Sequence, residues 1–459
     1  MTPSTSIKYH SNTNLNICVI LVGLPCRGKT FISNKIKTYL TWMMINSKIF
    51  NIGDYRRKQL DSQLDEFTSI DADFYNFENQ EGLKVRLNSY ENALKDMEKW
   101  FLNNEGVAIL DGTSSTRSHR KWLLERLRLL HIEPIFIESS SDDKDLERLN
   151  INALIKSSPD KKDFDFYEMK IKNYIKFYES MNEFDDEKDY TFVKLMKKAD
   201  GLEQAVINKV QSYLESKIIF YVMNLNYLNP SKVIWLSRHG ESVYNVEKKI
   251  GGDSRLSERG LMYAKKLPQL LKEQGFDETN QMSAWTSTLV RTNETAQYLP
   301  FDKILPWRAL NELDAGLCDG MTYEEIEEKY PEDFKERDDD KFEYRYKGGE
   351  SYKDVVLRVE PVMMELERQS NVLIITHQAV LRCIYAYFMN IPQDQSPWVA
   401  IPLHTLIKLE VRPYGACKVT LIKANIPAVS TYKEKGTSNV GEDASIKNNS
   451  SRNLLADTL

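Results

Sequence analysis

Two histidines of this chain each follow a run of apolar residues that is typical of a buried strand. His239 follows the run 233–236, with Arg238 directly before it. A second apolar run, 372–375, leads to His377. Because parallel strands end at one edge of a sheet, where α/β folds bind ligands, we expect the two imidazoles to lie together. An imidazole nitrogen is a nucleophile towards phosphorus, and an adjacent arginine can hold phosphoryl oxygens. The pattern therefore predicts phosphoryl transfer through a phosphohistidine.

Near the N-terminus, the stretch GLPCRGKT at 23–30 has the spacing of a phosphate-binding loop. It follows the apolar run 17–22 and precedes a helix-forming stretch, which is the context that such a loop requires. Its glycines let backbone N–H groups approach phosphates, while its lysine and threonine reach the β/γ-phosphates and Mg²⁺. A simple glycine turn before a helix is the alternative. The residues that would bind ATP are Gly23, Gly28, Lys29 and Thr30.

Asp111 ends a strand expected at 106–111, and with Thr30 it could hold Mg²⁺ or act on an acceptor hydroxyl. Taken alone, an acid at a strand end is often only a helix cap. Further side chains flank the phosphate loop and could clamp an anionic acceptor such as a sugar phosphate. They are Arg56, Arg86, Thr113 and Arg117. Each of these arginines, taken singly, is more often a solvated surface charge.

Hydrolysis also needs a proton donor for the departing alkoxide. Glu312 is the best candidate, with Asp314 and Glu241 as rivals. A polar and aromatic series downstream could hold a second phosphate and a sugar: Tyr323, Arg337, Lys341, Tyr352 and Arg382. Metal binding by the two strand-end histidines is disfavoured, because no third ligand has suitable spacing. The remaining histidines are expected to be structural or surface residues: His10, His119, His131 and His404.

Length and composition describe an ordinary globular chain. The 459 residues predict two or three domains, and the net charge of −5 gives no electrostatic reason to expect nucleic acid as a partner. The apolar runs are too short to span a membrane, and no secretory signal is visible at the N-terminus. Five scattered cysteines without CxxC spacing suit a reducing compartment and argue against a zinc site. We therefore expect a cytoplasmic protein.

Strands alternate with helical stretches from residue 15 onward, which is typical of parallel α/β sheets. In the first half we expect strands at 17–22, 48–52, 106–111, 133–138 and 218–222, and helices at 30–45, 83–103 and 202–214. The interval 142–201 is expected to be mostly helical, and a domain boundary is expected within 224–232. The resulting division is a disordered tail at 1–14, a P-loop domain at 15–228, a histidine domain at 229–427 and a flexible tail at 428–459.

These stretches together resemble the 6-phosphofructo-2-kinase/fructose-2,6-bisphosphatase family over roughly residues 15–430. The resemblance is carried by GLPCRGKT (23–30), NIGDYRR (51–57), SRHGESVYN (237–245), LNELDAG (310–316), RDDDKFEYRYKGGESY (337–352) and ITHQAVLRCIYAYF (375–388). An RHG motif alone would indicate only the wider histidine-phosphatase superfamily, which includes phosphoglycerate mutases. The attached P-loop domain, together with the series of arginine, lysine and tyrosine residues, limits the resemblance to this one family and disfavours a mutase function. The implied fold is a P-loop NTPase-like parallel sheet domain followed by a phosphoglycerate-mutase-like α/β domain.

The resemblance implies hydrolysis of fructose 2,6-bisphosphate to fructose 6-phosphate and phosphate, without a cofactor. His239 would take the 2-phosphoryl group, and Glu312 would protonate the leaving oxygen and then activate water. The residues that would stabilise the phosphoryl group are Arg238, Asn245, Arg291 and His377. Those that would hold the sugar and the 6-phosphate are Tyr323, Arg337, Lys341, Tyr352, Gln378 and Arg382. The P-loop half would use ATP and Mg²⁺, neither a membrane nor nucleic acid is implied, and a homodimer is left open.

The P-loop half departs from the family pattern. His119 stands where the family has an arginine, and Lys170 replaces an arginine four residues before the pocket tyrosine, Tyr174. Lysine cannot reproduce a bidentate guanidinium clamp. The resemblance therefore implies a phosphatase joined to a weak kinase. Two alternatives are a balanced bifunctional kinase/phosphatase and a P-loop domain that senses nucleotide without chemistry.

Overall fold

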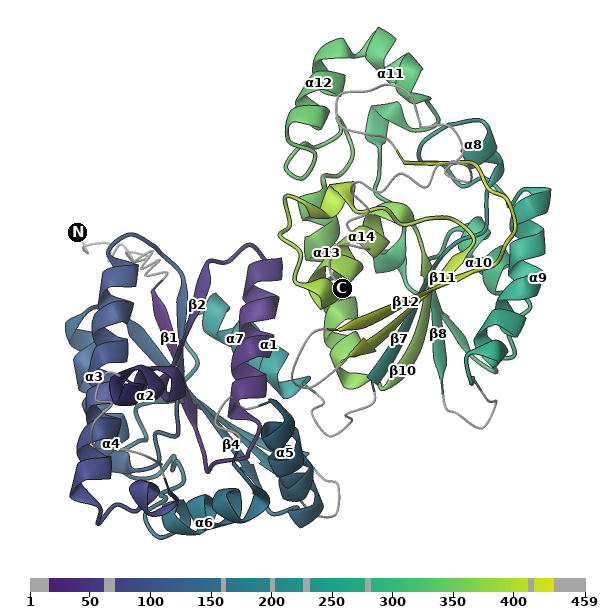
Figure 1. The fold of residues 1–459 in the computed structure, drawn as a ribbon. Helices are drawn as coiled ribbons and strands as arrows, with labels where there is room; N and C mark the ends of the chain where they lie inside the picture. Colours follow the sequence, from purple (N-terminus) through teal and green to yellow (C-terminus); the bar gives the residue numbers. More distant parts are fainter. Residues whose placement is uncertain are drawn as a thin grey trace, which may run out of the picture. The chain divides into compact units, whose positions relative to one another are not determined.

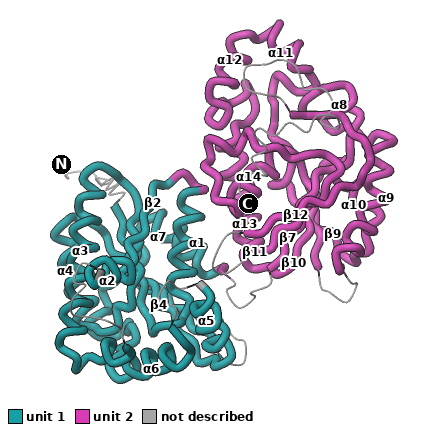
Figure 2. Tube along the Cα trace, in the orientation of Figure 1, with its two compact units in different colours: residues 1–41, 45–223 teal, residues 42–44, 224–459 magenta. Residues whose placement is uncertain are grey.

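The computed structural model describes residues 16–61, 71–157, 162–198, 203–225, 232–276, 282–411 and 417–432. The chain forms two compact units, one of residues 1–41 and 45–223 and the other of residues 42–44 and 224–459 (Figure 2). The tail expected at 1–14, most of the boundary expected within 224–232, and residues 433–459 lie outside the described residues. Within the described ranges, no helix is long and apolar enough to cross a bilayer.

The N-terminal unit is built on a sheet with the strand order β2-β3-β1-β4-β5-β6. Its strands are β1 (Ile17–Val22), β2 (Ser47–Asn51), β3 (Val107–Asp111), β4 (Glu133–Ser141), β5 (Thr191–Lys197) and β6 (Glu203–Asn208). Its helices are α1 (Lys29–Trp42), α2 (Ile52–Asp61), α3 (Gln80–Phe101), α4 (Arg117–Leu129), α5 (Lys144–Ser157), α6 (Phe164–Ile175) and α7 (Tyr213–Met223). All neighbours pair in parallel except β5 and β6.

Helices cover both faces of this sheet, which explains why β1 is an unbroken apolar run with every residue buried. On one face, Tyr90 and Leu94 of α3 and Leu123 of α4 pack with sheet residues such as Leu110. Figure 1 shows α1 and α7 on the opposite face. Because β1 lies between β3 and β4, the loop after β1 leaves the sheet where the strand order reverses, a usual place for a ligand.

Two expectations for the end of this unit are wrong. The helix expected at 202–214 is β6 over its first half, because Glu203–Asn208 pairs antiparallel with β5. The strand expected at 218–222 belongs to α7. Its β-branched run suggested a strand, but a capping box starts a helix, in which Ser212 accepts the Glu215 N–H at 3.2 Å and Glu215 accepts the Ser212 N–H at 2.8 Å.

The C-terminal unit has a second sheet, with the strand order β12-β11-β7-β10-β8-β9. Its strands are β7 (Lys232–Arg238), β8 (Ser283–Thr286), β9 (Ile304–Pro306), β10 (Asn371–Thr376), β11 (Thr405–Val411) and β12 (Lys418–Lys423). Its helices are α8 (Val243–Val246), α9 (Glu258–Glu273), α10 (Val290–Ala296), α11 (Tyr323–Lys329), α12 (Pro331–Asp339), α13 (Tyr352–Arg368) and α14 (Gln378–Met389). The strands β7, β10, β8 and β9 are parallel to one another. β11 pairs antiparallel with β7, and β12 pairs antiparallel with β11.

This sheet is also covered on two sides, with α9 on one face and α13 and α14 on the other (Figure 1). Tyr263 and Leu267 of α9 pack with Leu373 and Ile375 of β10. The helices α11 and α12 form an excursion between β9 and β10, beyond the end of the sheet that carries the two strand-end histidines. The excursion supplies side chains to that end of the sheet.

A buried ion pair holds the start of α4, and removing one partner is expected to destabilise the N-terminal unit. The guanidinium of Arg120 donates to the carboxylate of Glu187 at 2.5 and 3.1 Å, and both side chains are buried. Glu187→Gln leaves the arginine charge uncompensated, which costs about 3–5 kcal/mol for pairs of this kind. Hydrogen exchange of α4 amides against urea concentration measures the loss. Asp186→Asn, which changes an exposed neighbour, is the control, and an equal effect from both would contradict the assignment.

Candidate functional sites

The first candidate site lies in the C-terminal unit, where β7 and β10 end side by side. The two strands pair in parallel with Arg238 opposite Thr376. His239 then donates its backbone N–H to the Thr376 carbonyl at 3.0 Å. His239 and His377 therefore leave the same edge of the sheet, and their ring centroids lie 5.1 Å apart. The register of one strand pair brings the two predicted histidines together.

The ring of His239 is held in one orientation by its neighbour in the chain. Its Nδ1 lies 2.7 Å from the carbonyl oxygen of Gly240. Because a carbonyl only accepts, Nδ1 carries the proton and Nε2 carries the lone pair. Burial, together with the charges of Arg291 and Arg238, holds the pKa of His239 well below its usual value. The ring is therefore neutral near pH 7 and nucleophilic at Nε2.

Two buried nitrogen atoms next to this ring lack a hydrogen-bond partner among the described residues: Nε of Arg238 and Nδ1 of His377. Arg238 uses Nη1 to donate to the Ile401 carbonyl at 3.0 Å. His377 places Nε2 2.8 Å from the Ser287 hydroxyl. When that hydroxyl donates to Nε2, Nδ1 carries a proton and becomes a donor. Buried polar groups are normally paired, so two orphan groups in one place indicate a ligand with acceptor atoms, such as a phosphoryl group.

Glu312, the predicted acid and base, lies at the N-terminus of α14. Its carboxylate accepts the backbone N–H of Gln378 at 3.1 Å and that of Ala379 at 3.2 Å. It also interacts electrostatically with Arg238 and Arg291. The carboxylate is thus anchored by a helix end, at the wall of the pocket that contains the His239 ring.

The two rivals for this role have other positions. Glu241 is fully buried, and its carboxylate accepts from the Ser257 hydroxyl at 2.7 Å and from the Arg259 guanidinium at 2.9 Å. Asp314 is exposed. Neither carboxylate belongs to the described residues that line the pocket with Glu312. The contacts of Glu241 therefore indicate a structural role, and Glu312 stays the predicted acid and base.

Arg358 of α13 holds the backbone around Glu312, although no feature of the sequence marked it. Its guanidinium donates to the carbonyl groups of Ala309 at 2.6 Å, Asn311 at 2.8 Å and Glu312 at 3.2 Å. Glu350 neutralises it at 2.7 Å. From the sequence, an arginine in the middle of a helix is usually interpreted as a solvated surface charge. Only the folded chain shows that Arg358 donates to three carbonyl groups.

The pocket extends from His239 and Glu312 to a group of cationic and aromatic side chains, which come largely from the α11–α12 excursion and from α13 and α14. Of the residues predicted to contact the substrate of this unit, His377 is not among the described residues that line the pocket, whereas the following are: Asn245, Arg291, Tyr323, Arg337, Lys341, Tyr352, Gln378 and Arg382. The pocket therefore offers several cations, which suits a molecule with two anionic groups.

Phenol oxygens fix two arginines of this pocket. Arg337 donates from Nε to the Tyr346 hydroxyl at 2.7 Å and from Nη2 to the Tyr323 hydroxyl at 3.1 Å. Arg382 donates from Nη1 to the Tyr352 hydroxyl at 2.9 Å. Tyr346 was not among the predicted residues, although it lies in the stretch 337–352, where tyrosines and cations alternate.

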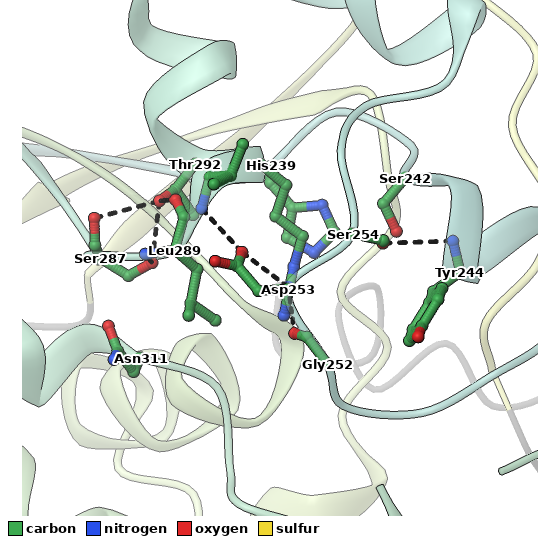
Figure 3. A network of polar contacts seen from close by, with 12 residues as sticks. His239, Ser242, Tyr244, Gly252, Asp253, Ser254, Ser287, Leu289, Thr292 and Asn311 are labelled. Atoms are coloured by element: carbon green, nitrogen blue, oxygen red, sulfur yellow. Dashed lines mark hydrogen bonds and ion pairs between the residues drawn. The ribbon is translucent and has the colours of Figure 1, made fainter. Parts of the chain in front are cut away.

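Arg291 is placed by a glycine-containing loop. Its Nη1 donates to the Gly252 carbonyl at 2.7 Å and lies 3.9 Å from the Asp253 carboxylate. Figure 3 draws Gly252 and Asp253 with their contacts, together with His239. Asp253 also accepts the backbone N–H of Val290 at 2.8 Å, which ties the start of α10 to the same loop. The loop thus sets both the position and the direction of the guanidinium.

A segment that the sequence assigns to the tail contributes to the pocket. Ser430 and Thr431 line it, and the Thr431 hydroxyl accepts from Nη1 of Arg238 at 2.7 Å. The backbone N–H of Val429 donates to the Glu241 carboxylate at 2.9 Å. Sequence reasoning missed these residues because their contacts use backbone groups and one hydroxyl, which leave no hydrophobic periodicity.

The second candidate site is the phosphate loop of the N-terminal unit. Gly23 has a φ of +139°, and a Cβ there would lie 2.5 Å from the Ser139 carbonyl oxygen, so the position requires glycine. The side chain of Lys29, the first residue of α1, donates to the Leu24 carbonyl. Burial lowers the pKa of Lys29 to about 7, and the charge of Asp111 opposes that change. The negative charge of a nucleotide would favour the ammonium form.

Asp111 ends β3 next to Asn51 of β2, which donates to it at 2.6 Å. The Thr30 side chain also hydrogen-bonds to this carboxyl, whose pKa is raised by burial. Mg²⁺ at such sites is held by one or two protein oxygens together with phosphates, so the Thr30 and Asp111 pair fits it. Across the described ranges, no group of three His, Cys, Asp or Glu residues could hold a metal by itself.

Several residues predicted for the acceptor gather around Tyr75. The Arg56 guanidinium lies 5.5 Å and the Lys170 ammonium 4.1 Å from the centre of its ring. The ring of Tyr174 is 6.0 Å away. Arg86 donates to the carbonyl of the residue before Tyr75 at 2.8 Å. This arrangement forms a cationic, aromatic wall suited to a sugar phosphate.

Arg117 and Thr113 make other contacts. The Arg117 guanidinium pairs with Asp185 at 3.3 Å. The backbone N–H of Thr113 donates to the Tyr90 hydroxyl at 3.1 Å, and the ring of His119 packs against the same tyrosine. The loop after Asp111 is thus held from within the core.

Two family models match the chain: 6-phosphofructo-2-kinase over residues 4–229, and histidine phosphatase superfamily (branch 1) over residues 234–424. The fructose-2,6-bisphosphatase of Saccharomyces cerevisiae is 59% identical over 441 residues, which cover 94% of each chain. The chain belongs to the 6-phosphofructo-2-kinase/fructose-2,6-bisphosphatase family. Rat 6-phosphofructo-2-kinase/fructose-2,6-bisphosphatase 3 is 41% identical, over 92% of this chain and 75% of that protein. Human 6-phosphofructo-2-kinase/fructose-2,6-bisphosphatase 1 is 42% identical, over 92% of this chain and 88% of that protein.

Membership of the 6-phosphofructo-2-kinase/fructose-2,6-bisphosphatase family confirms the resemblance and the order of the two α/β folds. The family models meet between residues 229 and 234, next to the division of the chain between Met223 and Asn224. The phosphate loop therefore lies within the first matched region, and the C-terminal site lies within the second except for Ser430 and Thr431.

The lowered pKa of His239 predicts that its ring stays neutral as pH falls through 6.5, where histidines in the unfolded chain take up a proton. The unfolded state then binds more protons than the folded state, so stability should fall below about pH 6.5. Ring nitrogen chemical shifts of isotope-labelled histidine, followed from pH 8 to 5, measure the titration. The His239→Gln protein identifies the signal. A His239 midpoint at or above 6.5 would contradict the geometry.

Proposed function

We propose that the C-terminal unit hydrolyses fructose 2,6-bisphosphate to fructose 6-phosphate and phosphate through a phosphohistidine. The observation that carries this proposal is the His239 ring, with its lone pair on Nε2, beside the orphan nitrogens of Arg238 and His377. The family membership and the name of the yeast relative support the substrate. Arg337 and Arg382 would bind the 6-phosphate, since they line the same pocket.

In the first step, Nε2 of His239 attacks the 2-phosphoryl phosphorus, and the bond from phosphorus to the 2-oxygen breaks. The departing oxygen keeps the bond electrons and takes a proton from Glu312. Arg238, Arg291 and His377 would stabilise the charge on the transferring group. Because these donors are already anchored by protein carbonyl and hydroxyl groups, little reorganisation is needed during the reaction.

In the second step, Glu312 accepts a proton from water, and the water oxygen attacks phosphorus. The bond from phosphorus to Nε2 breaks, the ring recovers its lone pair, and phosphate leaves. The backbone N–H groups of Gln378 and Ala379 would stabilise the carboxylate between the two steps. The carboxyl group thus ends the cycle in the state in which it began.

Labelling tests this mechanism. With fructose 2,6-bisphosphate carrying radioactive 2-phosphate, rapid quenching should give acid-labile label on His239, and label that persists in His239→Ala protein would overturn the assignment. Glu312→Gln should slow steady-state turnover by about two to four decades, because it removes the proton donor and the base. Asp314→Asn is the matched control, with a carboxylate of the same loop, and should leave turnover close to that of the unmodified protein.

For the N-terminal unit we infer a weak 6-phosphofructo-2-kinase that uses ATP and Mg²⁺. Gly23, Gly28 and Lys29 would cradle the phosphates, and Thr30 with Asp111 would hold Mg²⁺, whose positive charge would offset that of the phosphates. The wall around Tyr75 would bind fructose 6-phosphate. The intact nucleotide residues favour catalysis over the alternative of a sensing module, while Lys170 in place of a guanidinium favours weak acceptor binding over balanced activities.

Kinase turnover is tested in His239→Ala protein, so that product is not hydrolysed. With MgATP and fructose 6-phosphate we expect slow formation of fructose 2,6-bisphosphate, with a higher KM for the sugar than for ATP. Lys29→Met in the same background should abolish this reaction, and Lys29→Met alone should leave the phosphatase unchanged. ATP binding with no product in the His239→Ala protein would instead support the sensing module.

We further infer that the protein acts in the cytoplasm on small sugar phosphates and ATP, with neither nucleic acid nor a membrane as a partner. The net charge of −5 and the family support this setting. A homodimer is the assembly to be tested, by light scattering at several protein concentrations.

A further inference from the structure

Tyr90 of α3 lies beneath the loop that follows Asp111, inside the hydrophobic core of the N-terminal unit. Its hydroxyl accepts two consecutive backbone N–H groups, from Thr113 at 3.1 Å and from Ser114 at 3.3 Å. Neither N–H belongs to a strand or helix, because β3 ends at Asp111 and α4 begins at Arg117. One phenol oxygen therefore supplies hydrogen bonds that regular structure does not give this loop.

Gly112 makes room for that oxygen. A Cβ built on residue 112 would lie 2.2 Å from the Tyr90 hydroxyl oxygen and 2.9 Å from the ring carbon that bears it. Both distances are too short for any side chain at 112 unless the tyrosine moves. The glycine at 112 and the tyrosine at 90 therefore depend on each other, although 22 positions separate them in the sequence.

His119 forms the other side of this packing. Its ring lies 4.4 Å from the ring of Tyr90 and 5.5 Å from that of Trp122, edge to face in both cases. Its Nε2 is buried without a hydrogen-bond partner among the described residues. Burial, followed by the charge of Arg120, lowers the pKa of His119 to about 4, so the ring is neutral. The ring of His119 thus packs behind Tyr90. Among the described residues, its ring contacts are with Tyr90 and Trp122 and not with Tyr75.

The loop that Tyr90 holds connects both halves of the kinase site. It begins at Asp111, and the Thr113 carbonyl accepts the N–H of Gly23, the first glycine of the phosphate loop, at 3.1 Å. On the acceptor side, Tyr90 interacts electrostatically with Arg86 and Tyr174. A shift of this loop would therefore move Asp111 and Thr113 relative to both the nucleotide and the acceptor wall.

We propose that Tyr90 is a positioning residue for the kinase reaction, and that it fixes the loop 111–114 with Gly112 and His119 as its structural partners. This inference rests on the proposed kinase function of the N-terminal unit. Because the Tyr90 oxygen accepts two backbone N–H groups of the loop 111–114, it holds this loop in one position relative to the phosphate loop. An arginine at 119 would not add a cation to the acceptor wall, because its guanidinium would enter the aromatic packing and displace Tyr90.

The test uses the full chain with His239→Ala, so that the kinase product accumulates. Tyr90→Phe removes one oxygen atom and takes the acceptor away from the backbone N–H groups of Thr113, which is part-buried, and Ser114, which is buried. We expect kcat/KM for fructose 6-phosphate to fall by about tenfold or more, and the Kd for MgATP to rise by a smaller factor. The matched control is Tyr55→Phe, which also removes one hydroxyl, bonded to Asp96 at 3.2 Å and away from this loop. An unchanged kcat/KM in Tyr90→Phe protein would overturn the proposal.

Two variants at residue 119 distinguish two interpretations of His119. In one, its ring packs against Tyr90, and in the other, it stands where a cation would bind the acceptor. His119→Phe keeps the ring and should leave kcat/KM for fructose 6-phosphate within about twofold, whereas His119→Arg should lower it. A rise in kcat/KM on His119→Arg would overturn the proposal. These variants also decide the matter if Tyr90→Phe protein does not fold.

Hydrogen exchange distinguishes failure of this inference from failure of the proposed kinase. Amides in the segment 111–118 should exchange about tenfold faster or more in Tyr90→Phe than in Tyr55→Phe protein, whether or not turnover is detectable. No product from the His239→Ala parent would refute the kinase function alone. Equal exchange in the two tyrosine variants would refute the anchoring role of Tyr90, with or without kinase activity.

Discussion

The parallel pairing of β7 with β10 is the interaction on which the C-terminal site depends. Its register sets Arg238 opposite Thr376, so the next residue of each strand is a histidine at the same edge of the sheet. A slip of one residue would turn one of the two rings to the other face. The bond from the His239 N–H to the Thr376 carbonyl continues the pairing into the site itself. The pairing of these two strands therefore positions the proposed nucleophile.

Placing this nucleophile in a buried, cationic environment has a consequence for its charge. Burial and two nearby arginines disfavour a proton on His239, and His377 is lowered in pKa by burial and by the same cations. The arginines keep their own position by donating to backbone carbonyl groups, which are neutral and do not cancel their charge. The site thus combines a neutral nucleophile with fixed positive charge, the arrangement that favours an incoming phosphoryl dianion.

The N-terminal unit also places its candidate site at the edge where parallel strands end, but with different residues. Its phosphate loop leaves β1 where the strand order reverses, and Asp111 leaves the neighbouring strand at the same edge. Here, however, the loop after the acidic residue is not continued by a strand or helix, and a core tyrosine supplies its hydrogen bonds. The geometry of the acceptor side consequently depends on packing within the core as well as on the residues that would touch the acceptor.

The sequence by itself determined the strand-end histidines, the phosphate loop and the family, because each depends on residue types at short, fixed spacing. It also indicated β1 and β10, whose apolar runs are long enough to be unambiguous. The sequence did not predict β6 or α7 correctly, because a β-branched run fits either a strand or a buried helix. The strand β6 forms through its pairing with β5, and the helix α7 forms behind its cap at Ser212. Only the tertiary structure decided which of the three carboxylates lines the pocket, that Arg358 binds the carbonyl groups around Glu312, and that His119 packs against Tyr90. Those contacts join residues from 29 to 66 positions apart, and no local pattern encodes them.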